Sequence, residues 1–197
     1  MSFSAVILAG GKSSRMGRDK ALLKVDGKTL LARQIELSWA AGASEIFISG
    51  RADADYSRFR CRVLRDRFIG AGPLAGIEHA LATTITPLLL VLAVDLPAMS
   101  LEFVQHLAAN CAESIGAIPR VNGQIEPLAA FYPKAAQPLA ETLLHDKDNA
   151  ASTFSRQCVQ CGLARFFDAP ASQALYFANW NSPAEVGCAG HNFKVQD

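Results

Sequence analysis

An apolar run followed by a glycine-rich, basic stretch occupies residues 3–20, which read Phe3-Ser4-Ala5-Val6-Ile7-Leu8-Ala9-Gly10-Gly11-Lys12-Ser13-Ser14-Arg15-Met16-Gly17-Arg18-Asp19-Lys20. Residues 3–9 are typical of a strand buried on both faces of a parallel sheet. The adjacent glycines let backbone amides approach an anion closely, and four cations follow them. The segment therefore predicts a polyphosphate-binding loop at the carboxyl end of a core strand.

Two common phosphate-binding motifs do not fit this loop. A Walker loop would need a glycine five positions before Gly11, where the chain has Val6. The dinucleotide fingerprint Gly-x-Gly-x-x-Gly is also absent from the sequence that follows the strand. The alternative without a ligand is a surface turn with solvated charges, but the carboxyl end of a buried strand is where α/β sheets bind ligands.

Strands and helices alternate along the rest of the chain. We expect helices over 30–41, 74–82 and 100–111 and strands over 45–49, 61–64 and 87–94. Further strands are expected over 117–121 and 127–132, and helices over 134–144 and 152–157. This order predicts an α/β fold with a mostly parallel sheet covered on both faces. It also places Gly10-Gly11 and Asp95-Leu96-Pro97 at one rim of that sheet.

Composition narrows the class of protein. A chain of 197 residues, half of them hydrophobic, predicts one globular domain. The 19 Lys and Arg nearly balance the 18 Asp and Glu, which argues against nucleic acid or an anionic membrane as a partner. The longest apolar run, residues 88–94, is too short to span a bilayer. Five cysteines and a start without a basic leader region predict reduced thiols and a cytoplasmic location.

Asp95 follows the apolar run 88–94, at the point where a buried strand leaves the core. A carboxylate there could simply cap the next turn. It could also bind Mg²⁺, which proteins typically hold with one or two carboxylates together with substrate phosphates and water. Both interpretations are open at this point.

Residues 8–20 resemble the signature of the molybdenum cofactor guanylyltransferases, Leu-Ala-Gly-Gly-x-Ser-x-Arg-Met-Gly-x-Asp-Lys, and match every fixed position of it. The resemblance implies a three-layer α/β/α fold of the nucleotide-diphospho-sugar transferase type with a Rossmann-like sheet. It further implies transfer of GMP from GTP to molybdopterin or the molybdenum cofactor, with Mg²⁺ as cofactor. It also implies other cofactor-biosynthesis proteins or molybdoenzyme chaperones as partners.

The same resemblance assigns roles to individual residues. Nucleotide binding falls to Leu8, Ala9, Gly10, Gly11, Lys20, Asp66 and Asp95, and catalysis to Arg15, Lys20 and Asp95. Asp95 is the implied metal ligand, and Asn179 and Asn181 are the implied acceptor-binding residues. Residues 70–77 resemble the family's Gly-Pro-Leu-Ala-Gly stretch, a turn that enters a helix. The implied division is a nucleotide-binding half over about 1–115, an acceptor-binding half over about 116–186 and a tail over 187–197.

Some features depart from the pattern or compete with it. The family often has an asparagine at the end of the second strand, where this chain has Ile48-Ser49-Gly50-Arg51. For Asp66 the alternative is a surface carboxylate paired with Arg65 or Arg67. The spacing within the pairs Cys158/Cys161 and Cys188/His191 would also suit zinc ligands, but the gap between the pairs is longer than in the usual zinc modules. Burial of Cys158 or Cys161 as small apolar side chains explains the first pair equally well.

Two other functions stay open at this point. One is a related nucleotidyltransferase that uses CTP or a sugar or alcohol phosphate as acceptor. The other is a protein that binds GTP without turning it over. The choice of GTP over CTP rests on the resemblance alone.

Overall fold

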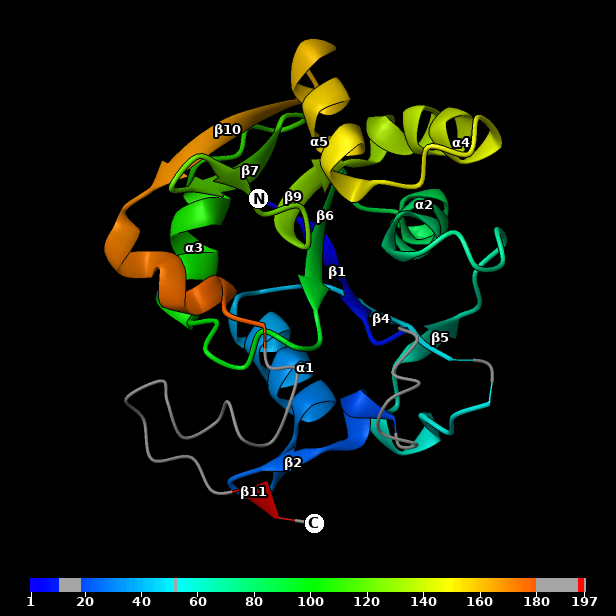
Figure 1. Ribbon diagram of the computed structural model, residues 1–197, viewed down its shortest axis with the longest axis vertical. Coiled ribbons are helices and arrows are strands. Elements are labelled where there is room, and N and C mark those ends of the chain that lie inside the picture. Colours follow the sequence, from blue (N-terminus) through cyan, green and yellow to red (C-terminus); the bar gives the residue numbers. More distant parts are fainter. Residues whose placement is uncertain (11–18, 52, 180–194, 197) are drawn as a thin grey trace.

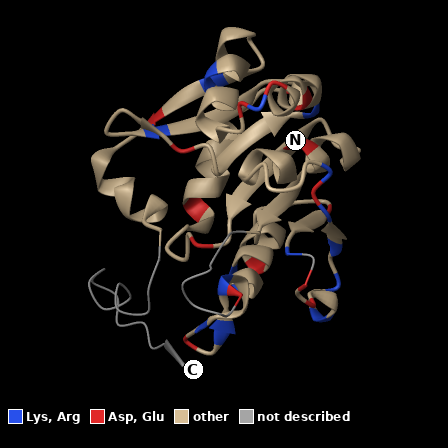
Figure 2. Cartoon of the chain, turned by 45° about the vertical axis from the view of Figure 1, so that its right-hand side comes forward, with Lys and Arg blue, Asp and Glu red and all other residues tan. Residues whose placement is uncertain are grey.

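The computed structural model describes residues 1–10, 19–51, 53–179 and 195–196. A five-stranded sheet in the order β5-β4-β1-β6-β9 forms its centre. The strands are β1 (Phe3–Leu8), β4 (Ile46–Ser49), β5 (Arg62–Leu64), β6 (Leu88–Ala93) and β9 (Ala129–Pro133). All neighbours are parallel except β6 and β9. The predicted mostly parallel sheet is confirmed, and β1, β4, β6 and β9 contain no charged residue (Figure 2).

Helices cover both faces of this sheet. α1 (Leu30–Ala40) and α3 (Leu101–Ala109) pack on one face, and α2 (Pro73–Thr83), α4 (Gln137–His145) and α5 (Ala151–Gln160) on the other. Figure 1 shows α3 to the left of the central strands and α2 to the right. Alternate residues of β1 enter different cores, Ile7 with α1 and α3 and Val6 with α2 and α4. The predicted three-layer α/β/α architecture is confirmed, and all five predicted helices are present.

A second sheet, in the order β10-β7-β8, lies against β9. Its strands are β7 (Gly116–Val121), β8 (Gln124–Ile125) and β10 (Ala164–Ala169), and β10 is followed by the 3₁₀ segment η4 (Ala171–Phe177). A Cβ atom on Gly116 would stand 2.1 Å from the carbonyl oxygen of Phe131. Only glycine therefore lets β7 cross this closely over the backbone of β9. The sequence did not predict β10.

A small sheet in the order β11-β2-β3 completes the described elements. β2 (Lys24–Val25) and β3 (Lys28–Thr29) form a hairpin, and β11 (Val195–Gln196) pairs with β2. The turn residues Asp26 and Gly27 both have positive φ, 49° and 78°, as a type I′ turn requires. Three short 3₁₀ segments are η1 (Lys20–Leu22), η2 (Ser57–Phe59) and η3 (Lys134–Ala136). Among the described residues, no helix has the length and apolar character to cross a membrane.

Candidate active site at the carboxyl edge of the sheet

Lys20 and Asp95 meet at the edge of the sheet where β1 and β6 end. The Nζ atom of Lys20 lies 2.9 Å from Oδ2 of Asp95, although 75 positions separate the two residues. The strands end level with each other, because Leu8 pairs with Ala93 and the backbone N–H of Val94 donates to the carbonyl of Leu8. The structure thus brings the end of the glycine-rich loop and the acidic residue together, as the sequence predicted.

Lys20 and Asp95 are still accessible to a ligand. Their side chains are 17% and 25% exposed, so neither is sealed in the core. An amine and a carboxylate at contact distance neutralise each other while no ligand is bound, and each can exchange its partner for a phosphate or a metal ion.

The backbone after β1 is tied to the neighbouring strand. The N–H groups of Ala9 and Gly10 both donate to the carbonyl of Ser49, the last residue of β4, over 2.8 and 3.0 Å. Leu8 and Ala9 are buried, and Gly10 is exposed. Of the other residues that the sequence assigned to this loop, Gly11 and Arg15 lie outside the described residues.

Asp19 anchors the end of the glycine-rich loop through two hydrogen bonds. Its Oδ1 accepts the N–H of Ala21 and so caps η1, which begins at Lys20. Its Oδ2 accepts the hydroxyl of Tyr56 over 2.6 Å. Tyr56 is only 2% exposed, and burial is the main reason that the pKa of its phenol is raised, with the hydrogen bond to Asp19 second. Asp19 is thereby fixed from two sides, and Lys20 is held next to it.

The second predicted nucleotide-binding carboxylate, Asp66, lies beyond the end of β5. The hydroxyl of Ser49 donates to its Oδ1 over 3.2 Å. Burial raises the pKa of Asp66, and the hydrogen bond from Ser49 only partly opposes that effect. Neither arginine that the sequence offered as its partner has an ion pair with Asp66, since Arg67 binds the buried carboxylate of Glu78 and no described ion pair includes Arg65.

A side chain of α1 is hydrogen-bonded to the turn that contains Asp95. Gln34 is 2% exposed, and its Nε2 donates to the carbonyl of Leu96 over 2.7 Å. This bond fixes the backbone one residue after Asp95, where the chain leaves β6. The N–H of Met99 donates to the same carbonyl over 3.1 Å, so Gln34 supplies the second of its two hydrogen bonds.

The residues at this edge fit a divalent ion that arrives with its nucleotide. Asp95 alone offers too few ligands for a protein-only cage, and the described residues contain no group of three His, Cys, Asp or Glu that could form one. Mg²⁺ usually retains waters and shares its coordination with substrate phosphates, for which one or two carboxylates suffice. Asp95 would hold the metal on the protein side.

The predicted acceptor and zinc residues are described only in part. Asn179 is exposed and lines an open pocket beside the β7–β8 hairpin, whereas Asn181 lies outside the described residues. Cys158 is fully buried in the core between α2, α4 and α5, and Cys161 is exposed. Cys188 and His191 also lie outside the described residues, so the zinc alternative stays untested.

The sequence analysis missed two residues of this site, Tyr56 and Gln34, and the contact of a third, Ser49, with Asp66. Gln34 could have been noticed, because it stands on the apolar stripe of α1 with Leu30, Leu31 and Ile35, where a polar residue needs a partner. The departure at Ser49 was visible, but its bond to Asp66 was not.

Comparisons with a family model and with individual proteins all point to the same family. The family model described as "MobA-like NTP transferase domain" matches residues 5–161. A relative from Opitutus terrae named "Probable molybdenum cofactor guanylyltransferase" is 37% identical over 187 residues, which are 93% of this chain and 93% of that protein. A relative of the same name from Carboxydothermus hydrogenoformans is 34% identical, again over 93% of each chain.

Two solved structures are similar in fold. One is molybdopterin-guanine dinucleotide biosynthesis protein A from Archaeoglobus fulgidus, with a TM-score of 0.73 and 23% identity over 94% of this chain and 96% of that chain. The other is 2-C-methyl-D-erythritol 4-phosphate cytidylyltransferase from Thermus thermophilus, with a TM-score of 0.70 and 19% identity over 96% and 97%. At these identities the likeness establishes the fold, a nucleotidyltransferase architecture.

Proposed function

The chain belongs to the MobA-like NTP transferase family, and from this premise we propose that it transfers GMP from GTP to the phosphate of molybdopterin or of its molybdenum-loaded form. Its relatives are named for this guanylyl transfer and are similar over nearly their whole length. The observation that carries the proposal is the contact between Lys20 and Asp95 at the carboxyl edge of β1 and β6. In this proposal the amine of Lys20 neutralises phosphates and the carboxylate of Asp95 holds a metal ion.

The reaction needs no covalent intermediate on the protein. An oxygen of the acceptor phosphate attacks the α-phosphorus of GTP. The bond from that phosphorus to the bridging oxygen of the β-phosphate breaks, and pyrophosphate leaves with the electron pair. Positioning and charge neutralisation supply most of the catalysis in related phosphoryl transfers, and we extend that logic to the α-phosphorus.

We assign the charge neutralisation to the residues at the rim. Lys20 exchanges Asp95 for the phosphates of the nucleotide, and Arg15 joins it on the charge that develops on pyrophosphate. Asp95 would hold Mg²⁺, which supplies Lewis-acid stabilisation of the phosphate charge when bound. Leu8, Ala9, Gly10, Gly11 and Asp66 are the proposed contacts to the rest of the nucleotide, and Asn179 and Asn181 those to the acceptor.

Four further predictions stay at the level of the sequence. They are the division into a nucleotide-binding and an acceptor-binding half, the cytoplasmic location, contacts with other cofactor-biosynthesis proteins or molybdoenzyme chaperones, and the lack of nucleic-acid or membrane partners. None of them is needed for the reaction proposed here.

Pyrophosphate release tests the proposal. The purified protein is incubated with Mg²⁺, molybdopterin and GTP, CTP, ATP or UTP in turn, and only GTP is expected to yield pyrophosphate together with the guanine dinucleotide. Lys20→Ala is expected to lower turnover by about 100-fold or more, as the loss of one charge-stabilising donor does elsewhere. Lys28→Ala is the matched control, because Lys28 pairs with Glu36 on the exposed side of the β2–β3 hairpin.

The two alternatives give different results in the same assay. Release with CTP in place of GTP, or with a sugar or alcohol phosphate in place of molybdopterin, would assign the chain to a related nucleotidyltransferase. Tight binding of GTP without pyrophosphate release would make it a GTP-binding protein. An active Lys20→Ala enzyme would remove Lys20 from the mechanism.

A further inference from the structure

An open pocket of about 770 Å³ lies between the β7–β8 hairpin, α5, β10 and the segment after η4. The residues of its lining that matter here are Arg120, Glu126, Arg156, Phe166 and Asn179. The lining is largely polar and contains two arginines and one carboxylate. Only Asn179 among them has a role in the proposed reaction.

Backbone hydrogen bonds place Glu126 at the reactive edge of the sheet. The N–H of Ala93 donates to the carbonyl of Leu128 over 2.8 Å, and Ala129 pairs with Leu92. Glu126 lies two residues before Leu128, and Asp95 lies two residues after Ala93. The hydrogen bond between Leu128 and Ala93 therefore brings the backbones of Glu126 and Asp95 to the same edge of the sheet. Ser49 and Asp66 flank Asp95 on the β4 side of the sheet, whereas Glu126 flanks it on the β9 side.

The carboxylate of Glu126 has no partner among the described residues. Its backbone is fixed, since its N–H donates to the carbonyl of Pro119 over 2.9 Å, but no described side chain or amide donates to its carboxylate. The side chain is half-buried, and this burial raises its pKa. A partly desolvated carboxylate without donors favours a ligand that brings N–H groups to it.

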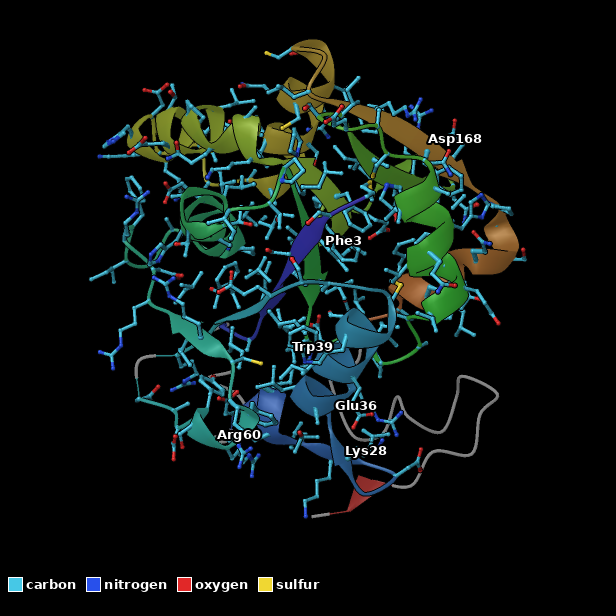
Figure 3. All side chains as sticks on the ribbon, turned by 180° about the vertical axis from the view of Figure 1, so that it is seen from behind. Phe3, Lys28, Glu36, Trp39, Arg60 and Asp168 are labelled. Atoms are coloured by element: carbon cyan, nitrogen blue, oxygen red, sulfur yellow. The ribbon has the colours of Figure 1, made fainter. Side chains whose placement is uncertain are left out.

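Arg120, the neighbouring arginine, is already paired with a carboxylate, and its guanidinium forms part of a planar surface in the pocket. Nε and Nη2 of Arg120 bind the two carboxylate oxygens of Asp168 over 2.7 and 2.8 Å. Figure 3 shows Asp168 on β10 at the outer edge of the molecule. The guanidinium also lies over the ring of Phe166, 4.9 Å from its centroid. Planar ligands stack on such surfaces.

From this arrangement we propose that Glu126 recognises the pterin ring of the acceptor. Its two oxygens accept the ring N–H and the adjacent amino group of the 2-amino-4-oxopyrimidine edge, in a paired contact of the kind that carboxylates make with planar N–H donors. The inference rests on the proposed function, which makes a pterin the acceptor. Guanine has the same edge, but the residues assigned to the nucleotide lie on the other side of Asp95.

Exchange of one ligand group tests this contact directly. Pterin and lumazine differ at one position, where lumazine has an oxygen in place of the amino group, and both can be titrated by their own fluorescence. The wild-type protein is expected to bind pterin about tenfold or more tightly than lumazine, as for one charge-assisted hydrogen bond. In Glu126→Gln the preference is expected to reverse, because the amide accepts the ring N–H and donates to the lumazine oxygen.

Matched controls separate recognition from folding. Glu113→Gln makes the same change at an exposed glutamate and is expected to keep the wild-type preference. Glu126→Gln removes a half-buried charge, so it is not expected to destabilise the fold. Equal binding of both rings by the wild-type protein, or an unchanged preference in Glu126→Gln, would overturn the inference.

Steady-state kinetics separate this inference from the proposed function. In Glu126→Gln the KM for molybdopterin is expected to rise about tenfold while the KM for GTP stays the same. A rise in the KM for GTP alone would mean that Glu126 binds the guanine ring of GTP, and the inference would be wrong. If the wild-type protein releases no pyrophosphate with GTP and molybdopterin, the proposed function fails, whatever the ring titrations show.

Discussion

The hydroxyl of Tyr56 donates to Asp19 over 2.6 Å and joins residues that are 37 positions apart. Asp19 caps η1, whose first residue is Lys20. Tyr56 also lies under Gly50, where a Cβ atom would come within 2.3 Å of its ring. The buried phenol therefore fixes the carboxyl end of the glycine-rich loop against the segment after β4, and we regard Tyr56 as a positioning residue for Lys20.

Tyr56→Phe removes this hydrogen bond, together with the weaker one that the hydroxyl accepts from the N–H of Arg51 over 3.3 Å, and keeps the ring. We expect the KM for GTP to rise about fivefold, because the lost bond contributes about 1 kcal/mol to holding Lys20 in place. Pyrophosphate release at varied GTP measures it. Tyr176→Phe is the control, since Tyr176 packs on Phe103 through its ring and its hydroxyl has no described partner. Equal effects of the two substitutions would contradict the positioning role.

Asp66 connects nucleotide binding to stability. Burial raises its pKa above the ordinary value of 3.8, so the folded state holds this proton more tightly than the unfolded state. The contribution of Asp66 to the free energy of unfolding therefore falls as the pH rises from about 3.8 through the raised pKa, and the destabilisation is complete above that pKa. A carboxylate kept at such a cost suggests a functional reason for it.

Asp66→Asn should therefore stabilise the fold at neutral pH and weaken GTP binding. The amide oxygen still accepts the hydroxyl of Ser49, so the substitution removes mainly the charge. Denaturant unfolding of both proteins across the pH range measures the effect. The difference in unfolding free energy is expected to vanish below about pH 3.8, where the wild-type carboxyl is neutral in both states. A variant that is less stable at pH 7 would contradict this sign.

Gly76 explains part of the Gly-Pro-Leu-Ala-Gly stretch. In α2 a Cβ atom at this position would lie 2.3 Å from Oγ of Ser49 and 3.0 Å from a methyl group of Leu8. The glycine thus lets the helix approach the ends of β4 and β1, which is a packing role in addition to any contact of the helix start with an anion. The same contact means that a change at Gly76 would displace the Ser49 hydroxyl from Asp66.

Gly76→Ala is expected to lower the unfolding free energy by about 1–3 kcal/mol through overpacking, although alanine is the better helix former. The KM for GTP should rise as well. Ser49→Ala removes the closest clashing atom, so the double variant is expected to be more stable than the sum of the single effects predicts. Additive losses would mean that the two residues do not press on each other.

Features that are marked by neighbouring residues in the chain could be predicted from the sequence, whereas contacts between distant residues could not. The strand over 3–9, the glycine-rich loop and Asp95 were predicted because each is marked by its own neighbours in the chain. The position of Gly10-Gly11 and Asp95 at one edge of the sheet was also predicted, since parallel strands share a carboxyl edge. The contacts of Tyr56 with Asp19 and of Ser49 with Asp66 join residues that no periodicity connects, so only the folded chain reveals them.

The unpredicted elements have similar causes. The β2–β3 hairpin has strands of two residues, too short for an alternation to appear, although its Asp26-Gly27 turn is a recognisable signal. In β10 the alternation is weak, because Phe166 and Phe167 are adjacent and only the end residues of the strand are buried. Its place is set by pairing with β7, a partner that lies about fifty positions earlier.

Gln34 gives the last prediction, because it ties the turn that contains Asp95 to α1. Its Nε2 donates to the carbonyl of Leu96 in a fully buried contact. Gln34→Leu keeps a similar volume and removes this donor, while the N–H of Met99 still donates to the carbonyl, so the unfolding free energy should fall by about 0.5–1.5 kcal/mol. Because the turn then no longer fixes the Asp95 carboxylate, the Mg²⁺ concentration needed for half-maximal activity should rise.

Titration of pyrophosphate release with Mg²⁺ at saturating GTP measures this shift, and Gln105→Leu on the exposed face of α3 is the control. The metal dependence separates positioning from general stability, since a variant that only unfolds more readily loses active molecules without changing the Mg²⁺ requirement of those that remain. A Gln34→Leu protein with reduced stability and an unchanged Mg²⁺ requirement would therefore show that Gln34 supports the fold and does not orient Asp95.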